Sequence, residues 1–352
     1  MLTGTFGRVP ISAHHSVVGS LVAVALITKG PSAVHWELVK EILFSWVGNP
    51  LLGMATSFAI FVLIDKAILR RDEPASAFER AKWLLYLCSF QACLPFVLTK
   101  SPQIHVGGGT AVIVSVFLGL LHAAFSRHLL LWLHAAKARY SSLAALTEDQ
   151  EDELDSEGAE GKLTPRGRDE KLREVEQHFG PLLILSALSV AFVHGAQDVS
   201  NAAGPLMQIA AQYMPQQGAS GTATGAQLPW PLLLGVGAFV VGDLTLGSKV
   251  IVTVGSKITD MTPSRAFAAQ MGTVVALTSA TLLALPVSTS ECIVGSVIGV
   301  GLAKKVCGYE DAGLNLRVLR KIWAAWLLTI PYAGTIAALF FYFVQLLCRL
   351  SA

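Results

Sequence analysis

Long apolar runs separated by short polar stretches make up most of the chain, and they predict membrane-spanning helices. Several of them approach the ~20 residues that a helix needs to cross a bilayer. The runs cover residues 38–64, 83–98, 107–134, 229–242, 265–285 and 322–347, a shorter one ends at Ile27, and another begins at Gly180. Because the runs are continuous and do not alternate with polar residues, they favour helices over a membrane β-barrel. We therefore expect an all-α fold, that of a polytopic helical membrane protein.

Glycine and proline lie inside several of these runs. They occur at Gly48-Asn49-Pro50, at Gly195, at Gly204-Pro205 and at Pro331. Glycine frees the backbone and proline removes a hydrogen-bond donor, so we expect the helices to break there. The segment 247–257 is too polar and too rich in glycine for a plain crossing. Broken or re-entrant helices at the midplane of the membrane are therefore part of the expected fold.

The composition supports a membrane protein. Of the 352 residues, 53% are hydrophobic and 14% are charged, whereas a soluble domain is about 25% charged. The net charge is +2 and there is no basic patch with interleaved aromatic residues, so we expect the lipid bilayer and not a nucleic acid as a partner. The five cysteines form no CxxC pair and show no metal-ligand spacing, so we expect no metal site.

The apolar run VAFVHGAQDVSNAAGPL, at 190–206, carries an unusual set of polar residues. They are His194, Gln197, Asp198 and Asn201. Their spacing of i, i+3, i+4 and i+7 places them on one face of a helix. A polar face at lipid depth is costly, so we expect it to face a water-filled cavity or a substrate path. A buried structural network is the alternative, but the acid has no Lys or Arg within a turn to pair with.

An internal repeat relates the start of the chain to its last third. The segment PISAHHSVVGS at 10–20 matches PVSTSECIVGS at 286–296 in its proline, first serine, valine, glycine and last serine. Farther on, the Trp…Pro…Gly pattern at 46–53 is echoed at 326–334. Chance similarity between apolar helices is the alternative, but these features occur in the same order. Secondary transporters are commonly built from inverted repeats, with the substrate site where broken helices meet.

A charged segment at 136–178 divides the chain. This segment is too highly charged to form a buried hydrophobic core, so we expect a solvated loop with a short helix at its end. We accordingly divide the chain into three parts. They are 1–135, an incomplete first repeat with linking membrane helices, 136–178, a charged cytoplasmic loop, and 179–352, a second repeat with the polar face described above.

The distribution of lysine and arginine predicts how the chain is oriented. These residues gather at 65–82 and 302–321, whereas 28–40 carries only two of them. By the positive-inside tendency, the two basic stretches and the charged loop are expected in the cytoplasm, and 28–40 outside. The C terminus would then lie outside. Whether the membrane is the plasma membrane or that of an organelle stays open.

Taken together, the motifs resemble those of a known family. HGAQDVSNAAGPL resembles the GANDVAN signature of the inorganic phosphate transporter (PiT) family. PISAHHS and PVSTS resemble that family's repeated P-V-S-T-T-H element, and 260–290 resembles the stretch that joins the two in the second half. The resemblance covers most of the chain except 83–178. It implies a cation-coupled symporter of inorganic phosphate, built from two inverted repeats.

The chain also departs from the family pattern. The family carries GANDVAN twice and here it occurs once, so we expect a truncated gene model or splice form, with a diverged half-site protein as the alternative. Smaller departures are Gln197 for the signature asparagine, Ser200-Asn201 for Ala-Asn, Ala13-His14 for Thr-Thr, and Ser290-Glu291 for Thr-His.

Phosphate carries roughly one to two negative charges at neutral pH, and its oxygens are strong acceptors. A site for it in a membrane needs donors and a compensating cation. The helix start after Pro286 would offer backbone N–H groups and a favourable dipole. The side chains that we expect to bind phosphate are Gln197, Asn201, Ser288, Thr289, Ser290 and Ser12.

Asp198 cannot bind phosphate directly while it is charged, because like charges a few ångströms apart repel. We expect Asp198 and Asn201 to hold the driving cation, Na⁺ or H⁺, so that each ion binds well only with the other. No other cofactor is expected. Weaker candidates, for which packing or snorkelling to the interface is the alternative, are His194, Lys249, Lys257, Gln270 and Glu291.

Cation-coupled phosphate symport by alternating access is thus the expected function. A different class of function is a non-transporting membrane component, such as a receptor or partner subunit, and the single signature motivates it. An enzyme finds little support, because Ser288 has no base at a recognisable spacing and the chain has no nucleotide-binding loop. Homo-oligomerisation is left open.

Overall fold

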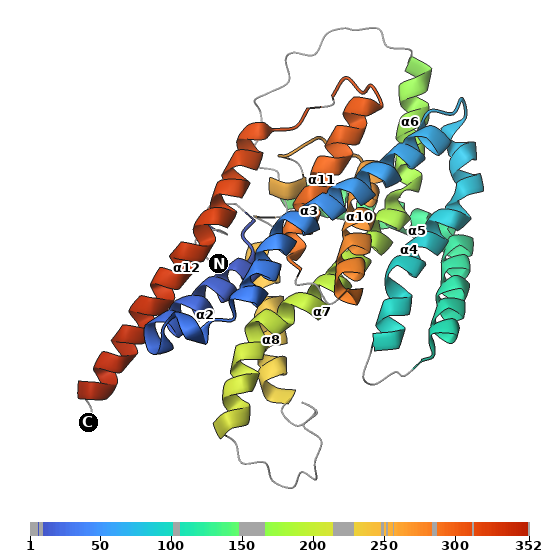
Figure 1. Ribbon diagram of the computed structural model, residues 1–352. Helices are drawn as coiled ribbons and strands as arrows, with labels where there is room; N and C mark the ends of the chain where they lie inside the picture. The colour runs from blue at the N-terminus through green and yellow to red at the C-terminus, as the bar shows by residue number, and fades with distance from the viewer. Residues whose placement is uncertain are drawn as a thin grey trace. The chain divides into compact units, whose positions relative to one another are not determined.

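The computed structural model is mostly helical (Figure 1). It describes residues 6, 10–100, 106–147, 166–213, 229–247, 250, 253–255, 257–283, 287–311 and 313–350. Lys249, a predicted site residue, and Pro286, which precedes a predicted helix start, lie outside the described residues.

Most of the helices coincide with the apolar runs, except that α6 lies in the charged segment and α5 extends into it. The α-helices are α2 Ala13–Lys29, α3 Trp36–Ile64, α4 Pro74–Lys100, α5 Gly108–Thr147, α6 Arg166–His178, α7 Gly180–Tyr213, α8 Pro229–Gly242, α10 Pro263–Leu282, α11 Thr289–Val306 and α12 Leu316–Leu350. Single turns of tighter or wider geometry are η1 Pro31–Ala33, η2 Asp65–Leu69 and η3 Asp243–Gly247.

Six helices in the described part of the chain are long and apolar enough to cross a membrane. They cover residues 36–69, 74–99, 108–126, 180–212, 230–247 and 316–350. Many of their apolar side chains are exposed, such as Leu327 at 72% and Phe340 at 66% on α12. Apolar surface on this scale is unfavourable in water and suits a helix that faces lipid. The predicted all-α, polytopic membrane fold is confirmed.

The predicted helix breaks at Pro50, Gly195, Pro205 and Pro331 are wrong. α3, α7 and α12 each continue through these residues. A proline removes one backbone hydrogen bond. At membrane depth, however, the neighbouring backbone groups have no water to bond, so the flanking turns stay helical. The polar face of α7 therefore lies on a continuous helix.

α10 and α11 form a helical hairpin. α10 ends at Leu282 and α11 begins at Thr289. At the open end of the hairpin, Lys304 Nζ on α11 lies 3.2 Å from the carbonyl oxygen of Asp260 and 3.4 Å from the hydroxyl of Thr259, both shortly before α10. The chain thus enters and leaves the hairpin at the same end, which is the connectivity expected for a re-entrant pair.

The chain divides into two compact units. Unit 1 contains residues 1–59, 190–261 and 268–352, and unit 2 contains residues 60–189 and 262–267. Unit 1 therefore holds both copies of the repeated element and most of the predicted site residues.

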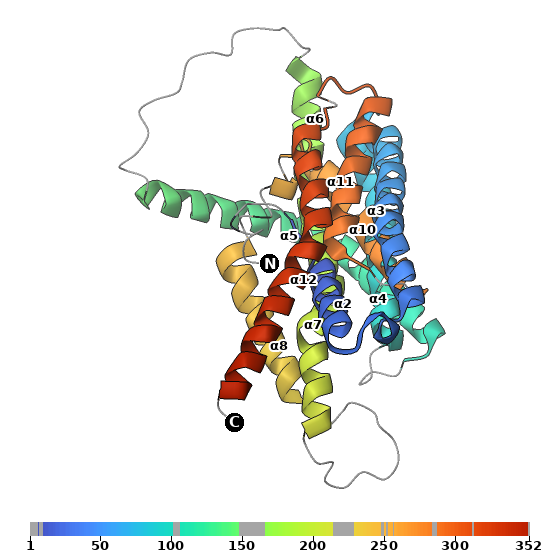
Figure 2. The same cartoon turned by 60° about the vertical axis from the view of Figure 1, so that its left-hand side comes forward.

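Within unit 1, each repeated element packs against the long helix of the other repeat. α2 lies along α12 in both views (Figures 1 and 2). A Cβ atom on Gly19 of α2 would lie 2.6 Å from the carbonyl oxygen of Ile330 in α12. A Cβ atom on Gly295 of α11 would overlap the carbonyl oxygen of Pro50 in α3. Since Gly19 and Gly295 match in the repeat, these two close approaches are equivalent.

Unit 2 contains α4 packed against α5 and α6. Residues 136–147, expected as part of the charged loop, continue α5, and the short helix expected at the end of that loop is α6. Glu176 of α6 accepts hydrogen bonds of 2.7 Å from the backbone N–H of Ser264 and from the hydroxyls of Ser264 and Thr262. This carboxylate anchors the start of α10.

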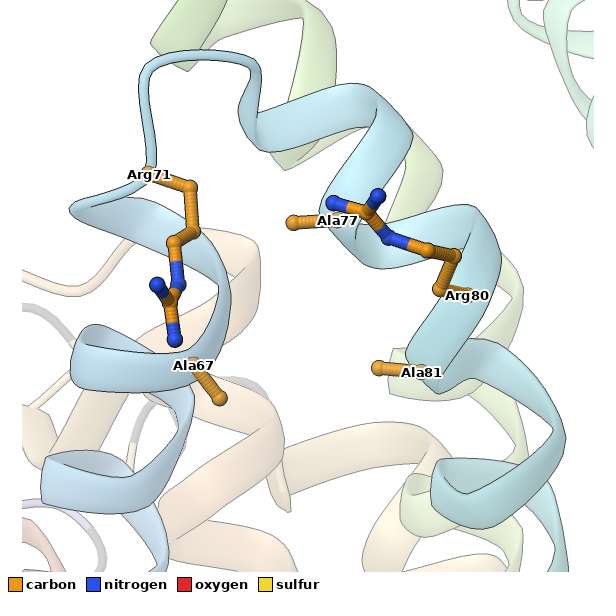
Figure 3. Close-up of a pocket in the computed structure, with 5 residues that line it drawn as sticks. All are labelled: Ala67, Arg71, Ala77, Arg80 and Ala81. Atoms are coloured by element: carbon orange, nitrogen blue, oxygen red, sulfur yellow. The ribbon is translucent and has the colours of Figure 1, made fainter.

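The basic stretch at 65–82 surrounds an open hollow in unit 2. Figure 3 shows Arg71 and Arg80 beside this hollow of about 440 Å³, with Ala67, Ala77 and Ala81 along its walls. Both arginines are exposed. The turn between η2 and α4 thus presents positive charge at the helix ends that are expected in the cytoplasm.

Candidate functional site

The N-terminal ends of α2 and α11 meet at a pair of serines. Ser12 precedes α2 and Ser288 precedes α11. Their hydroxyl oxygens lie 2.9 Å apart, and the residues are 1% and 3% exposed. Ser12 and Ser288 match in the repeat, and contact between matching residues is expected where a two-fold axis relates two repeats. We call this place the serine junction.

A second pair of matching residues meets one helical turn farther along. His15 follows Ser12 on α2 as Glu291 follows Ser288 on α11. His15 Nε2 lies 2.5 Å from Glu291 Oε1, and the two residues are 3% and 0% exposed. A buried carboxylate is costly unless it is paired, so this contact accounts for how Glu291 is tolerated at the centre of unit 1.

Two tryptophans hold the imidazole ring of His15. The centroid of a Trp46 ring lies 3.8 Å from that of the imidazole. His15 Nδ1 lies 3.2 Å from the carbonyl oxygen of Trp326. The indole N–H of Trp326 donates to the carbonyl oxygen of Pro10 at 2.9 Å, which ties α12 to the segment leading into α2.

The predicted phosphate-binding hydroxyls of α11 lie at the serine junction. The hydroxyl of Ser288 makes a 3.1 Å contact with that of Ser290 and does not cap its own helix. Thr289 Oγ1 is buried and has no hydrogen-bond partner among the described residues. The first backbone N–H groups of a helix also lack intrahelical acceptors. The junction therefore offers hydroxyl and amide donors to a buried anion.

Three of the polar residues on the predicted face of α7 contact one another. Asp198 Oδ2 lies 2.6 Å from His194 Nε2. Asn201 Nδ2 donates to Asp198 Oδ1 at 2.9 Å. Asp198 is thus engaged at both oxygens, with its side chain 14% exposed and that of His194 34% exposed. The carboxylate is thus partly accessible and is paired with an imidazole nitrogen and an amide donor.

Gln197 points to a different neighbour. Its amide donates to the hydroxyl of Thr281 on α10, so it links the signature helix to the hairpin. Thr281 in turn donates to the carbonyl of Leu277 at 2.7 Å. Gln270, also on α10, is half-buried. The sequence did not indicate Thr281, because nothing in the pattern of α10 relates it to α7.

One described interaction links the polar face of α7 to the start of α2. His14, which lies between Ser12 and His15, interacts electrostatically with Asp198. The serine junction and the Asp198 network both lie in unit 1, and His14 is near enough to Asp198 for the charge of the carboxylate to act on it. This is the relationship that a coupled anion and cation would need.

Lys257 is exposed and lies away from this group. It lines an open hollow with Gly313, Leu314 and Asn315. The sequence also gave no role to Trp46 or Trp326, and it did not pair His15 with Glu291. Aligning the two repeated elements places His15 at the position that matches Glu291. A base and an acid at matching positions were the feature of the sequence from which this contact could have been predicted.

Comparisons with known proteins extend the likeness beyond the motifs. The profile of the phosphate transporter family matches residues 1–337. The chain is 31% identical over 341 residues to a putative phosphate permease of Haemophilus influenzae, covering 96% of this chain and 72% of that protein. It is 31% identical to the chloroplastic inorganic phosphate transporter 2-1 of Arabidopsis thaliana, covering 94% of this chain and 54% of that one.

A solved structure is also similar. It is that of a sodium-dependent phosphate transporter, with a TM-score of 0.72, 27% sequence identity, and coverage of 98% of this chain and 76% of that one. The similarity thus runs through both repeated elements and the helices between them. With the six apolar helices, it identifies a multi-pass integral membrane protein.

Proposed function

The chain belongs to the phosphate transporter family, and on that premise we propose that it carries inorganic phosphate across a membrane with a monovalent cation, Na⁺ or H⁺, by alternating access. Transport of phosphate is supported by the family and by the likeness to a sodium-dependent phosphate transporter. The family and the fold are those of transporters and not of enzymes.

The observation that carries this proposal is the meeting of two helix N-termini at Ser12 and Ser288. Each N-terminus offers the positive end of a helix dipole. The N–H groups at the start of α11 are not capped by Ser288, whereas at α2 the hydroxyl of Ser12 accepts a hydrogen bond from the N–H of His15. Thr289 adds a buried hydroxyl that has no partner among the described residues. An anion held there would gain donors on two sides, as at other helix N-termini. Phosphate would bind by displacing the contact between the two serines.

Asp198 supplies the coupling. Its charge would repel a nearby phosphate in a poorly hydrated site unless a cation lay between them. The carboxylate of Asp198 and the side-chain oxygen of Asn201 suit Na⁺, a hard cation. If the coupling ion is H⁺ instead, the proton could bind to His194, which lies 2.6 Å from Asp198. Either ion would make phosphate binding more favourable, and phosphate would do the same for the ion.

Uptake of radiolabelled phosphate into liposomes containing the purified full chain tests this function. We expect uptake above that of empty liposomes, driven by an inward gradient of Na⁺ or of H⁺ but not by choline. Comparing the two gradients identifies the ion. Asp198→Asn is expected to abolish the dependence on that gradient.

The matched control is Glu37→Gln, which removes an exposed acid that pairs only with neighbouring Lys40 in the described contacts. It should leave uptake unchanged. If folded wild-type protein gives no uptake with either gradient, the non-transporting alternative is favoured. If Asp198→Asn keeps full gradient dependence, Asp198 does not bind the coupling ion.

A further inference from the structure

The contacts of His15 and Glu291 determine how many protons the two side chains hold between them. The carbonyl oxygen of Trp326, 3.2 Å from His15 Nδ1, can only accept a hydrogen bond. Nδ1 must therefore carry a proton. His15 Nε2 and Glu291 Oε1 lie 2.5 Å apart in a close ion-pair contact that lacks hydrogen-bond alignment, and two lone pairs this close would repel each other unless one of the two atoms carried a further proton. Whichever atom holds that proton, the pair as a whole is neutral.

Neutrality matters because both residues are buried. His15 is 3% and Glu291 0% exposed. Loss of the shared proton would leave an unpaired negative charge next to the serine junction, and gain of another would leave a positive charge. The neighbouring residue on α2 is also titratable: it is His14, which interacts electrostatically with His15 and Asp198. The pair is therefore expected to keep its single proton.

The position of the pair relates it to the anion site. Positions i and i+3 lie on neighbouring parts of a helix surface, so His15 lies beside Ser12, and Glu291 beside Ser288. A bond between His15 and Glu291 restricts how the two helix N-termini can rotate or separate. Such a restriction would hold the two serine hydroxyls at their observed spacing of 2.9 Å.

We propose that His15 and Glu291 form a proton-sharing clasp between the two repeats, which positions Ser12 and Ser288 to receive the anion without contacting it. This inference rests on the proposed function. His15 Nδ1 hydrogen-bonds to the carbonyl oxygen of Trp326, Nε2 lies in close contact with Glu291, and the ring packs on Trp46. The pair therefore acts on phosphate through the serines.

A double-mutant cycle tests the clasp in the full chain reconstituted in liposomes. His15→Ala and Glu291→Ala are each expected to raise the KM for phosphate by about tenfold, with a smaller effect on the maximal rate. The double variant should be no worse than the worse single variant, because all three lack the same contact. Effects of the two substitutions that multiply would overturn the proposal.

Two restoring variants separate positioning from general stability. Glu291→Gln keeps a donor to His15 Nε2, as a protonated acid does, and the exchange His15→Glu with Glu291→His rebuilds the pair at matching positions. Both should bring KM to within about threefold of wild type. Variants that lower the melting temperature while KM stays at the wild-type value would show a structural role only.

The exposed residues His35 and Glu37 provide controls, as His35→Gln and Glu37→Gln, and neither should change KM. The melting temperatures of the same cycle report on the contact without any transport measurement. If the wild-type protein carries no phosphate, the proposed function fails. If it does and the cycle is additive, only the clasp fails.

Discussion

Gly295 of α11 lies so close to Pro50 of α3 that a Cβ atom would overlap the carbonyl oxygen of Pro50. The two helices therefore touch through their backbones, and only hydrogen fits between them. Glycine at such a contact is common where membrane helices approach closely, since packing and not hydrophobicity drives their association.

Gly295→Ala should destabilise the protein by about 1–3 kcal/mol, because the added methyl group forces α11 away from α3. Gly48→Ala, also on α3, should be neutral or stabilising by up to about 1 kcal/mol, because among the described residues no atom beyond its own stretch of helix backbone lies within 4 Å of its Cβ position. Thermal unfolding in detergent measures both. Equal melting temperatures for the two variants would contradict the close contact.

Thr289→Val should weaken phosphate transport without loss of stability. It removes a buried hydroxyl that has no partner among the described residues, so the folded protein loses no bond. If that hydroxyl binds the anion, KM should rise by about tenfold. The check is phosphate uptake beside a melting curve of the same preparation.

The contrasting variant is Thr273→Val on α10. Thr273 Oγ1 lies 2.9 Å from the carbonyl of Ala269 and 3.0 Å from the hydroxyl of Ser296. Its removal should lower stability by about 1 kcal/mol and leave KM unchanged. A Thr289→Val protein that behaves like Thr273→Val would remove Thr289 from the anion site.

Lys304→Met should loosen the open end of the hairpin. Lys304 is fully buried and contacts the carbonyl of Asp260 and the carboxylate of Asp311, the latter at 2.9 Å. Since Asp311 is 43% exposed, solvent screens part of this pair, and we expect a loss of about 1–3 kcal/mol.

Lys305→Met is its matched control, since the neighbouring lysine is exposed. It should change stability by less than about 0.5 kcal/mol. Hydrogen exchange of residues 257–261 gives a local measurement, and faster exchange is expected only in Lys304→Met. Unchanged exchange there would mean that Lys304 does not hold the two ends together.

The orientation predicted from the basic stretches can be tested with single cysteines in a cysteine-free background. Arg71→Cys replaces an exposed residue expected in the cytoplasm, and His35→Cys replaces an exposed residue expected outside. A membrane-impermeant maleimide added outside should label only His35→Cys. Labelling of Arg71→Cys from outside would reverse the orientation.

Much of the candidate site was predictable because helical spacing is a local property. The i, i+3, i+4 and i+7 positions placed His194, Asp198 and Asn201 on one face of α7, which is where the structure has them in contact. Gln197 shares that face, yet its partner Thr281 comes from α10. Which side chain of another helix meets a given position depends on packing distances that spacing within one helix does not contain.

The helix breaks were predicted wrongly for a related reason. Pro50, Pro205 and Pro331 are local signals against helix, but the helices around them continue. The penalty for leaving backbone groups unpaired in hydrocarbon exceeds the loss of one hydrogen bond. Whether a helix continues through a proline was therefore decided by the membrane environment of the helix and not by the residue type alone.

The sequence by itself determined that this is a helical membrane protein with a repeated element and a polar face inside an apolar run, because hydrophobicity and periodicity act over one helix at a time. Only the tertiary structure decided that matching residues of the two repeats touch, Ser12 with Ser288 and His15 with Glu291. That contact arises because each repeated helix packs on the long helix of the other repeat, which brings positions more than 270 residues apart to one point.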